Sequence, residues 1–343
     1  MEALFSSLER AGVSRVLAVA DRPSGLRAVI AIDDTTLGPA AGGVRTMRYA
    51  TANDGLADAL SLARAMTIKC ALAGLDAGGA KAVVLDHEGL DRRQAFLKLG
   101  RVIEELGGLF RTAGDLGTTG ADLEVMASVC RYVHTDERGL SKAVARGLLA
   151  CIQACVELRG SSIHGQRVVV QGAGSIGAAV AETLVNAGAK VFLADVREER
   201  ARALAERLGP AVTVIDARDA LSFPADILAP CAIGGVITSD LARSTSAWAI
   251  CGAANNALVS AEVARILADR GIQHVPDPIA SAGAVIDGIG ASVMGLSDRS
   301  ALIDKLGATT KEVLTRAVAE HKTPVEVAEA LAYERIKKAA TLP

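Results

Sequence analysis

The predicted fold of this 343-residue chain rests on one stretch, Val168-Val169-Val170-Gln171-Gly172-Ala173-Gly174-Ser175-Ile176-Gly177. Its apolar first part predicts a buried strand, and the glycines that follow are spaced as G-x-G-x-x-G directly before a helical pattern. The first glycine permits a tight turn, the second lets a pyrophosphate approach the backbone, and the third lets the helix pack on the strand. Backbone N–H groups and the dipole at the start of that helix would bind the phosphates without a lysine.

The residues that follow this stretch strengthen the prediction of a dinucleotide site. A strand over 167–171, a helix over 176–187 and a strand over 190–194 form a βαβ unit, and Asp195 ends the second strand. A carboxylate there accepts hydrogen bonds from both ribose hydroxyls and repels a 2′-phosphate, so we expect NAD rather than NADP. Arg197 is the opposing signal, because a nearby arginine accommodates a 2′-phosphate. The expected cofactor-binding residues of this unit are Gly172, Gly174, Ser175, Ile176, Gly177, Asp195 and Val196.

The same alternation of strands and helices extends over the rest of the chain. After residue 140 it predicts helices at 142–157, 198–208 and 261–270, strands at 213–215, 226–229, 247–251 and 273–275, and helices at 281–297, 300–321 and 325–340. Before residue 140 it predicts strands at 27–32 and 81–85 and helices at 53–69, 92–105 and 121–131. A glycine-rich helix start can arise from packing alone, but here strand, helix and acidic residue are in register.

This organisation predicts an α/β protein of two domains with a boundary near 134–141. We expect residues 1–140 to form an α/β substrate and oligomerisation domain, joined by a C-terminal helix over about 322–343. Residues 141–321 should form a Rossmann NAD-binding domain, with the C-terminal helices packing back across the cleft.

Composition excludes several classes of function. The 37 basic and 39 acidic residues are interleaved and give a formal net charge of −2, so nucleic acid and anionic membrane are not expected partners. Neither a signal peptide nor an apolar run of about 18 residues is evident, which predicts a soluble, cytosolic protein. The six cysteines include no C-x-x-C pair, so we expect buried free thiols and no metal site. The five histidines are expected in surface or loop positions, and Trp248 in the core.

Two lysines in the first domain carry the chemical signal. Lys69 ends the segment Met66-Thr67-Ile68-Lys69, and Lys81 ends Gly78-Gly79-Ala80-Lys81, so the two are predicted to flank a glycine-rich turn. A single lysine is ordinarily a solvated surface charge, but both lie among small apolar residues. Desolvation and a neighbouring cation each lower the pKa of a lysine, which lets one act as a general base while the other binds a carboxylate. Asp115 offers a proton partner.

These motifs resemble the glutamate/leucine/phenylalanine/valine dehydrogenase family, and most of all its leucine and phenylalanine dehydrogenase branch. The segments that carry the resemblance run nearly end to end: Thr35 to Ala40 with Gly42, Gly43 and Arg45, Met66 to Lys69, Gly78 to Lys81, Gly114 to Thr118, Ala229 to Ala232, and Gly252 to Asn256. The resemblance implies NAD-dependent oxidative deamination of an L-amino acid to its 2-oxo acid and ammonia. It also implies a homo-oligomer, a dimer or larger.

The resemblance assigns roles to individual residues. It implies that Lys69 binds the substrate α-carboxylate, Asn255 orients the substrate, Lys81 activates water, and Asp115 exchanges protons with the substrate amine. Further substrate-binding residues expected from it are Gly42, Ala41, Met66, Leu116, Val285 and Gly288. Further cofactor-binding residues expected from it are Cys231, Ala232, Ala254 and Asn255.

The chain departs from the family pattern at a few positions. Ala41 replaces a usual Leu and Gly288 a usual Val, which enlarges the expected pocket and favours large apolar or aromatic amino acids such as Phe, Trp or Leu, although Leu116 is bulkier than usual. Val144 replaces a common threonine, and Ser281 an asparagine, which removes hydrogen-bonding groups near the nicotinamide. Two alternatives stay open: a non-catalytic NAD-binding paralogue, and a secondary-metabolite dehydrogenase that acts on an unusual amino acid or amine.

Overall fold

A computed structural model describes residues 2–136 and 138–341 of the chain. The chain divides into two compact units, which are described separately below. The first unit comprises the described residues of Met1–Glu137, Gly288–Ser297 and Ala332–Pro343. The second comprises Arg138–Asp287 and Asp298–Leu331.

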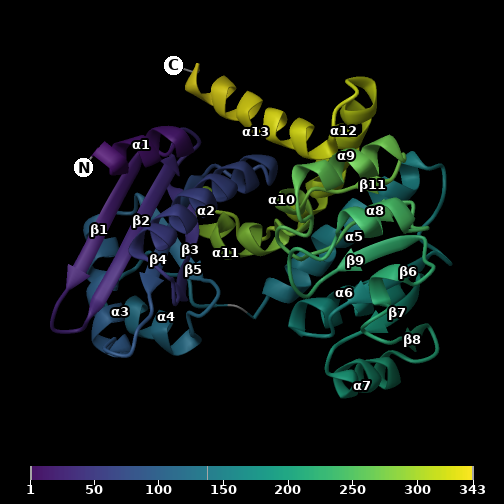
Figure 1. Cartoon of the computed structure of the whole chain (residues 1–343), viewed down its shortest axis with the longest axis horizontal. Helices are drawn as coiled ribbons and strands as arrows, with labels where there is room; N and C mark the ends of the chain where they lie inside the picture. The colour runs from purple at the N-terminus through teal and green to yellow at the C-terminus, as the bar shows by residue number, and fades with distance from the viewer. Residues whose placement is uncertain (1, 137, 342–343) are drawn as a thin grey trace. The chain divides into compact units, whose positions relative to one another are not determined.

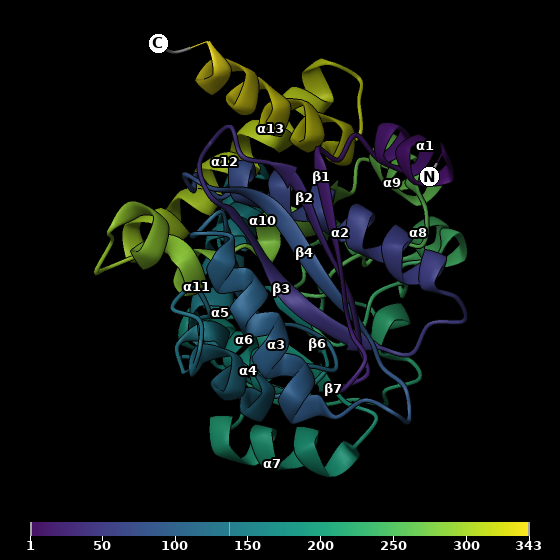
Figure 2. The ribbon, with the colours of Figure 1, turned by 90° about the vertical axis from the view of Figure 1, so that its left-hand side faces the viewer.

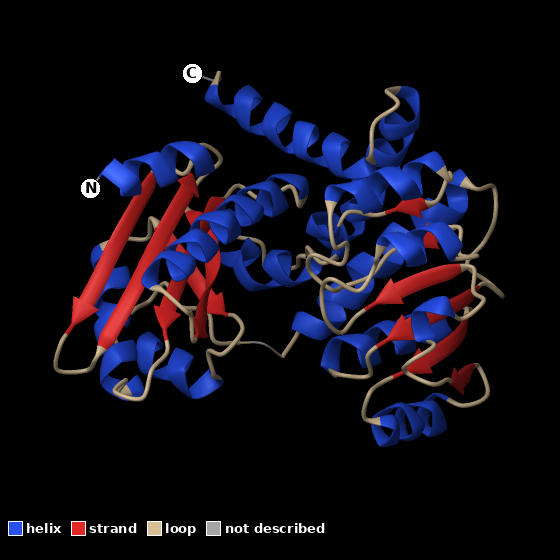
Figure 3. Ribbon diagram, in the orientation of Figure 1, coloured by secondary structure: helices blue, strands red, loops and turns tan. Residues whose placement is uncertain are grey.

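The first unit is built on a five-stranded mixed sheet (Figures 1 and 3). Its strands are β1 (Arg15–Asp21), β2 (Leu26–Asp34), β3 (Ala40–Met47), β4 (Gly78–Leu85) and β5 (Phe110–Gly114), in the order β1-β2-β4-β3-β5. The strands β1, β2 and β4 pair antiparallel, whereas β4, β3 and β5 run parallel. The carboxyl ends of β3 and β5 therefore lie at one edge of the sheet.

Helices cover both faces of this sheet (Figure 2). On one face lie α1 (Glu2–Ala11) and α2 (Ala52–Leu72), where Ala59 and Ala63 pack against Val83. On the other lie α3 (Arg92–Glu105) and α4 (Gly120–Ala127), where Phe96 packs into a core with Val84. Threonine N-caps, Thr51 on α2 and Thr119 on α4, each form a capping box and define where these helices begin.

The glycine-rich segment before Lys81 is part of a strand, and the prediction of a turn there was wrong. Strand β4 begins at Gly78, whereas a strand from residue 81 was expected. A Cβ on Gly79 would overlap the backbone of α2 at Ala63 and Thr67. The missing side chain therefore lets α2 lie directly on β4, which brings the Lys69 helix against the Lys81 strand.

The second unit is a six-stranded parallel sheet in the order β11-β10-β9-β6-β7-β8. Its strands are β6 (Arg167–Gln171), β7 (Lys190–Ala194), β8 (Val212–Val214), β9 (Ile227–Pro230), β10 (Ala249–Ile250) and β11 (Gln273–His274). The order reverses direction between β6 and β9, which makes the carboxyl ends of these two strands the topological switch point of a Rossmann sheet. Dinucleotides bind at such a point.

Helices and short helical turns connect and flank these strands. They are α5 (Leu140–Leu158), α6 (Ser175–Asn186), α7 (Glu198–Leu208), η1 (Ala220–Ser222), α8 (Ser239–Ser244), α9 (Ala261–Asp269), α10 (Asp277–Ala280), α11 (Gly283–Met294), α12 (Ser300–Ala319) and α13 (Pro324–Ala340). No helix within residues 2–136 or 138–341 combines the length and the apolar character needed to span a bilayer.

Several elements differ from their predicted limits. The structure adds β1, β3, β5, α1, α8 and α10, none of which the pattern predicted. Helix α4 ends at Ala127, four residues early, because the Ser128 hydroxyl donates to the carbonyl of Val125 and caps the helix. The helix expected over 281–297 is α11, which begins only at Gly283.

Two of the aromatic predictions need correction. His274 was expected in a surface or loop position, but it is buried in β11, and burial lowers its pKa to about 4. The other four histidines lie in loops or turns as predicted. Trp248 is half-buried and not in the core, because the Arg159 guanidinium stacks 4.8 Å above its ring. Five of the six cysteine thiols are buried, and Cys231 is partly buried.

Candidate active site and cofactor site

An ion pair between Lys81 and Asp115 forms the centre of the candidate active site. Lys81 lies within β4 with only 6% of its surface exposed, and Asp115 directly follows β5. Gly43 on β3 makes the approach possible, because a Cβ there would lie 2.9 Å from Asp115 Cβ and 2.6 Å from the Gly114 carbonyl oxygen. Two residues that are 34 positions apart in sequence are thus in direct contact.

The pair extends into a chain of alternating charges that the sequence analysis did not predict. Arg45 Nε donates to Asp115 Oδ2 at 3.1 Å, and Arg45 Nη1 donates to Asp58 Oδ2 at 3.2 Å. The Tyr49 hydroxyl donates to the same Asp58 oxygen at 2.6 Å. The network was missed because β3 was not predicted to be a strand. In a strand, Gly43 and Arg45 point to the same face of the sheet.

The local environment moves the pKa values of this pair in useful directions. Burial lowers the pKa of Lys81, and this effect outweighs the attraction of Asp115, which opposes it. Burial alone would raise the pKa of Asp115, but the charges of Lys81 and Arg45 outweigh it and the carboxyl pKa is lowered. The site therefore holds a lysine that gives up its proton more readily than usual next to a carboxylate that stays ionised.

The other predicted residues of the first unit surround the pair to different degrees. Lys69 and Met66 are half-buried on α2, less than one turn apart. Ala41 and Gly42 are buried in β3, and a Cβ on Gly42 would overlap the Ala80 carbonyl. Leu116 follows Asp115 and is 59% exposed.

Gly288 and Val285 lie on α11, in the first and the second unit respectively. Among the described residues, the one contact within 4 Å of a Cβ built on Gly288 would be with His134 Cδ2, at 3.7 Å. Val285 is half-buried. Val144, where the family commonly has a threonine, is buried on α5.

The predicted glycine loop lies at the switch point of the second unit. Gly172 adopts φ +104°, and a Cβ on it would lie 2.9 Å from Ala232 Cβ after β9. Gly177 passes so close to the Gly172 carbonyl that no side chain fits, whereas the position of a Cβ on Gly174 is open. Within the described ranges, no side chain caps the start of α6 at Ser175. The loop thus brings backbone N–H groups to an open helix N-terminus, as a pyrophosphate requires.

Asp195 lies beside this loop at the end of β7. Its Oδ2 accepts from the Ala173 N–H at 2.7 Å, and its Oδ1 accepts from the Arg197 N–H at 2.8 Å. Burial raises the carboxyl pKa, but these two hydrogen bonds and the charges of Arg197 and Arg200 together outweigh it and hold the pKa below its usual value. A pocket of about 730 Å³ opens next to it, lined among others by Val196, Ile215 and Asp216. Val196 is 92% exposed. The residues present therefore fit the adenosine end of a dinucleotide.

Asn255 is held by the short helix α10. The Ser281 hydroxyl donates to Asn255 Oδ1 at 3.3 Å and to the Asp277 carbonyl at 2.7 Å. Asp277 Oδ2 also accepts from the Asn256 N–H at 2.9 Å, where Asn256 adopts φ +51°. The replacement of an asparagine by Ser281 had suggested that this site loses a hydrogen-bonding group. The Ser281 hydroxyl supplies one.

The remaining predicted cofactor residues lie at the same end of the parallel sheet. Cys231 and Ala232 follow β9, and the Ala254 N–H donates to the Pro230 carbonyl at 3.0 Å. This contact holds the Ala254–Asn255 turn against the end of β9.

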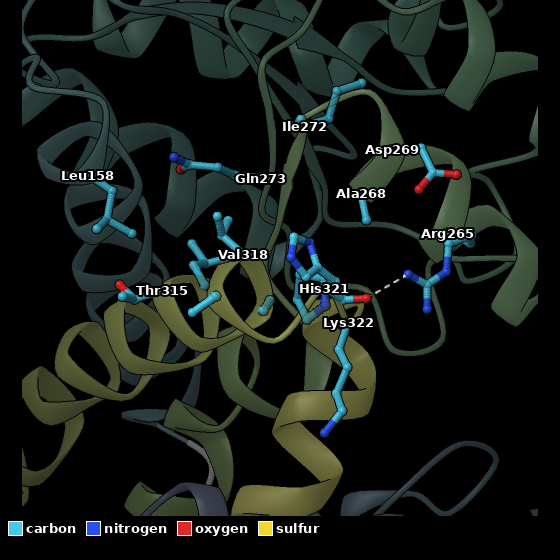
Figure 4. Close-up of a pocket in the computed structure, with 15 residues that line it drawn as sticks. Leu158, Arg265, Ala268, Asp269, Ile272, Gln273, Thr315, Val318, His321 and Lys322 are labelled. Carbon is cyan, nitrogen blue, oxygen red and sulfur yellow. Dashed lines mark hydrogen bonds between the residues drawn. The ribbon is translucent and has the colours of Figure 1, made fainter.

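A separate hollow of about 750 Å³ lies at the other end of the second unit (Figure 4). Leu158 at the end of α5, Gln273 at the start of β11 and Val318 on α12 line it. Arg265 donates to the His321 carbonyl at 3.3 Å. Because Gln273 begins its strand, this hollow lies at the amino ends of the parallel strands, away from the glycine loop. It contains none of the predicted site residues.

Comparison with known proteins gives the same picture. The model of the Glu/Leu/Phe/Val dehydrogenase dimerisation domain matches residues 14–132, and that of the Glutamate/Leucine/Phenylalanine/Valine dehydrogenase family matches 192–342. The NAD-binding domain of the D-isomer specific 2-hydroxyacid dehydrogenases matches 125–227. These matches cover both units.

Individual relatives are similar over most or nearly all of the chain. Valine dehydrogenase of Streptomyces virginiae is 39% identical over 99% of this chain and 98% of its own. Phenylalanine dehydrogenase of Lysinibacillus sphaericus is 38% identical over 78% of this chain and 73% of its own. The crystal structure of L-tryptophan dehydrogenase from Nostoc punctiforme superposes with a TM-score of 0.88 at 30% identity, covering 98% of this chain and 99% of that one.

The expected family, two-domain α/β fold and cofactor are thereby confirmed. The chain belongs to the glutamate/leucine/phenylalanine/valine dehydrogenase family, and it is an NAD-dependent oxidoreductase that acts on amino acids.

Proposed function

We propose that this enzyme oxidatively deaminates an L-amino acid with a large apolar or aromatic side chain, with Lys81 as the base that activates water. The observation that carries the proposal is the buried contact of Lys81 with Asp115, together with the lowered pKa of the lysine. A lysine with a lowered pKa loses its proton more readily than a solvated lysine does, and the free amine can then remove a proton from water.

Each proposed step uses a group of matching charge. Lys69 pairs with the substrate α-carboxylate, and Asp115 takes a proton from the substrate ammonium so that the amine is neutral. When bound, NAD would supply the acceptor for the hydride of Cα, and loss of that hydride would convert the substrate amine to an imine. Water then attacks the imine carbon as Lys81 takes its proton, and the collapse of the carbinolamine releases ammonia and the 2-oxo acid. Asn255 orients the substrate.

The proposed cofactor contacts lie at the switch point of the second unit. The loop of Gly172, Gly174 and Gly177, with Ser175 and Ile176 at the start of α6, binds the pyrophosphate. Asp195 accepts from the ribose hydroxyls, and Val196 covers the adenine side. The residues after β9 and β10, namely Cys231, Ala232, Ala254 and Asn255, line the nicotinamide half.

The substrate class is proposed from two small residues. Ala41 and Gly288 stand where bulkier side chains are usual in the family, and the position of a Cβ on Gly288 has room around it. Ala41 itself is fully buried, so the enlargement we propose rests mainly on Gly288. The similarity to a valine dehydrogenase favours valine as the second candidate, and the names of the relatives range from valine to tryptophan dehydrogenase.

We also propose that the enzyme is a homo-oligomer formed through the first unit. The family model that matches residues 14–132 is described as a dimerisation domain. Strand β1 lies at the edge of the first sheet, and Leu17 on it is 38% exposed. An exposed apolar edge strand can pair with a second copy of itself.

Replacing Lys81 tests the mechanism. We expect Lys81→Ala to lower kcat for oxidative deamination by about a thousandfold, since general-base catalysis contributes about 10² to 10⁴. NADH binding should stay normal because the residue lies in the other unit from the glycine loop. The measurement is NADH formation at saturating substrate, with Lys305→Ala on the exposed face of α12 as the control. Near-normal activity of Lys81→Ala at normal melting temperature would rule out this base.

Replacing Gly288 tests the substrate class. We expect Gly288→Val to lower kcat/KM for phenylalanine and tryptophan by about tenfold relative to valine, because a pocket distinguishes a few methylenes by about 1–3 kcal/mol. The measurement is kcat/KM for valine, leucine, phenylalanine and tryptophan in both proteins. Ala291→Val, at an exposed position of the same helix, is the matched control. A wild-type enzyme that clearly prefers valine would refute the proposed substrate class.

Replacing Asp195 tests the cofactor contacts. We expect Asp195→Asn to raise the Kd for NADH about tenfold, because a charged hydrogen bond contributes about 1.5–3 kcal/mol. The ratio of the Kd for NADPH to the Kd for NADH should therefore fall. Fluorescence titration with both nucleotides gives the two constants. Asp240→Asn, which changes a fully exposed carboxylate of the same unit, should bind as the wild type does. An unchanged ratio of the two constants in Asp195→Asn would contradict the assignment.

Replacing Leu17 tests the assembly. We expect Leu17→Lys to shift the mass in solution toward that of a single chain, because a buried charge opposes pairing of two β1 edges. Analytical ultracentrifugation over a range of concentrations measures it. A wild-type chain that sediments as a monomer throughout would exclude the proposed oligomer.

A further inference from the structure

We propose that Arg45 is a positioning residue whose charge, divided between Asp115 and Asp58, controls proton transfer at Lys81. This inference rests on the function proposed above. It assigns a role to Arg45, which the sequence motifs contain without a role, and to Asp58, which lies outside those motifs.

The geometry makes Arg45 a bridge between two carboxylates. Its Nε donates to Asp115 Oδ2 at 3.1 Å, and its Nη1 donates to Asp58 at 3.2 Å from Oδ2 and 3.4 Å from Oδ1. The rigid guanidinium plane therefore fixes where Asp115 stands relative to Lys81. A lysine at position 45 could keep the charge but has no planar fork with which to bridge both carboxylates.

Asp58, the last carboxylate of this network of charges, is also held in place. Asp58 lies on α2, and the Tyr49 hydroxyl donates to its Oδ2 at 2.6 Å. Burial and Asp58 raise the pKa of Tyr49, so the phenol stays neutral and keeps donating. Arg45 and Asp58 each have about a quarter or less of their side-chain surface exposed, so solvent screens their charges only in part.

The charges of Arg45 and Asp58 shift the pKa of Lys81 in opposite directions. The Arg45 charge lowers the pKa of Lys81 and that of Asp115, whereas the Asp58 charge raises the pKa of Lys81. Asp58 therefore offsets part of the Arg45 charge. The free lysine base is available at a pH set by the balance of the two.

Few other charged groups face Lys81 from the elements that pack against β4. From β2, Asp33 is itself partly buried, and burial raises its pKa although a hydrogen bond from Thr67 opposes the rise. From α2 come Arg64, which lies near Asp33, and Lys69. These groups are the same in all the variants below, so they do not change the expected direction of the effects.

Opposite pH shifts distinguish this role from a merely structural one. The kcat/KM for oxidative deamination should rise with pH as Lys81 loses its proton. Arg45→Gln removes the cation, so the rise should move to higher pH, by about one pH unit. Asp58→Asn leaves more of the Arg45 charge to act on Lys81, so the rise should move to lower pH. A residue that only supports the fold would lower the rate without moving the two profiles in opposite directions.

The experiment is kcat/KM for oxidative deamination of phenylalanine from pH 6 to 11 in the full-length enzyme. The variants are Arg45→Gln, Arg45→Lys and Asp58→Asn. Arg48→Gln is the matched control, because Arg48 is exposed and its Nε lies 3.9 Å from Asp86 Oδ2. We expect Arg45→Lys to keep the wild-type pH profile but to lose at least tenfold in kcat, because Asp115 is no longer held by a planar guanidinium group that also binds Asp58.

Each outcome decides the question. Opposite shifts of Arg45→Gln and Asp58→Asn support the inference, and profiles that shift together or stay in place overturn it. If Arg45→Gln unfolds, the direction of the Asp58→Asn shift and the kcat of Arg45→Lys carry the test. A wild-type enzyme without amino-acid-dependent NADH formation would overturn the proposed function. Loss of activity in Lys81→Ala without any pH shift in the other variants would overturn this inference alone.

Discussion

The architecture of the first unit depends on placing one charged lysine inside a sheet. Moving an ammonium group out of water costs several kcal/mol unless a carboxylate and further hydrogen bonds compensate it. Asp115 supplies that partner only because β5 ends beside β3 and because Gly43 has no side chain to keep the carboxylate away. The Lys81–Asp115 pair thus depends on the neighbouring ends of β3 and β5, on Gly43, and on the hydrogen bond from Arg45 that holds Asp115 from outside.

Burial has a functional consequence as well as a cost. It lowers the pKa of Lys81, whereas the attraction of Asp115 alone would raise it, so the lysine remains a usable base. The second unit uses a different device for the cofactor. Backbone N–H groups at the start of α6 and the carboxylate of Asp195 meet at a switch point and need no lysine. Each unit therefore brings one part of the chemistry.

Much of this could be predicted from the sequence, and the rest could not for physical reasons. The Rossmann strands and helices have strong periodicity, and β6 and β7 begin and end where predicted. Strand β3 was missed because Ala40 to Gly43 has low β propensity and is stabilised by its neighbours β4 and β5. Once β3 is missed, Arg45 cannot be placed on the face of Lys81. The helical pattern around Asp58 gives no signal of its partner Arg45, because Arg45 lies on strand β3 and not on the same helix.

The central claim is that Lys81 is a lysine poised to lose its proton, and its own titration tests that claim most directly. The measurement is the pH dependence of the Lys81 side-chain signal by NMR in protein labelled at lysine, assigned by comparison with a Lys81 variant. Our account predicts that Lys81 titrates clearly below the ordinary lysine pKa of about 10.4. A Lys81 signal that titrates at or above the ordinary value would contradict the account.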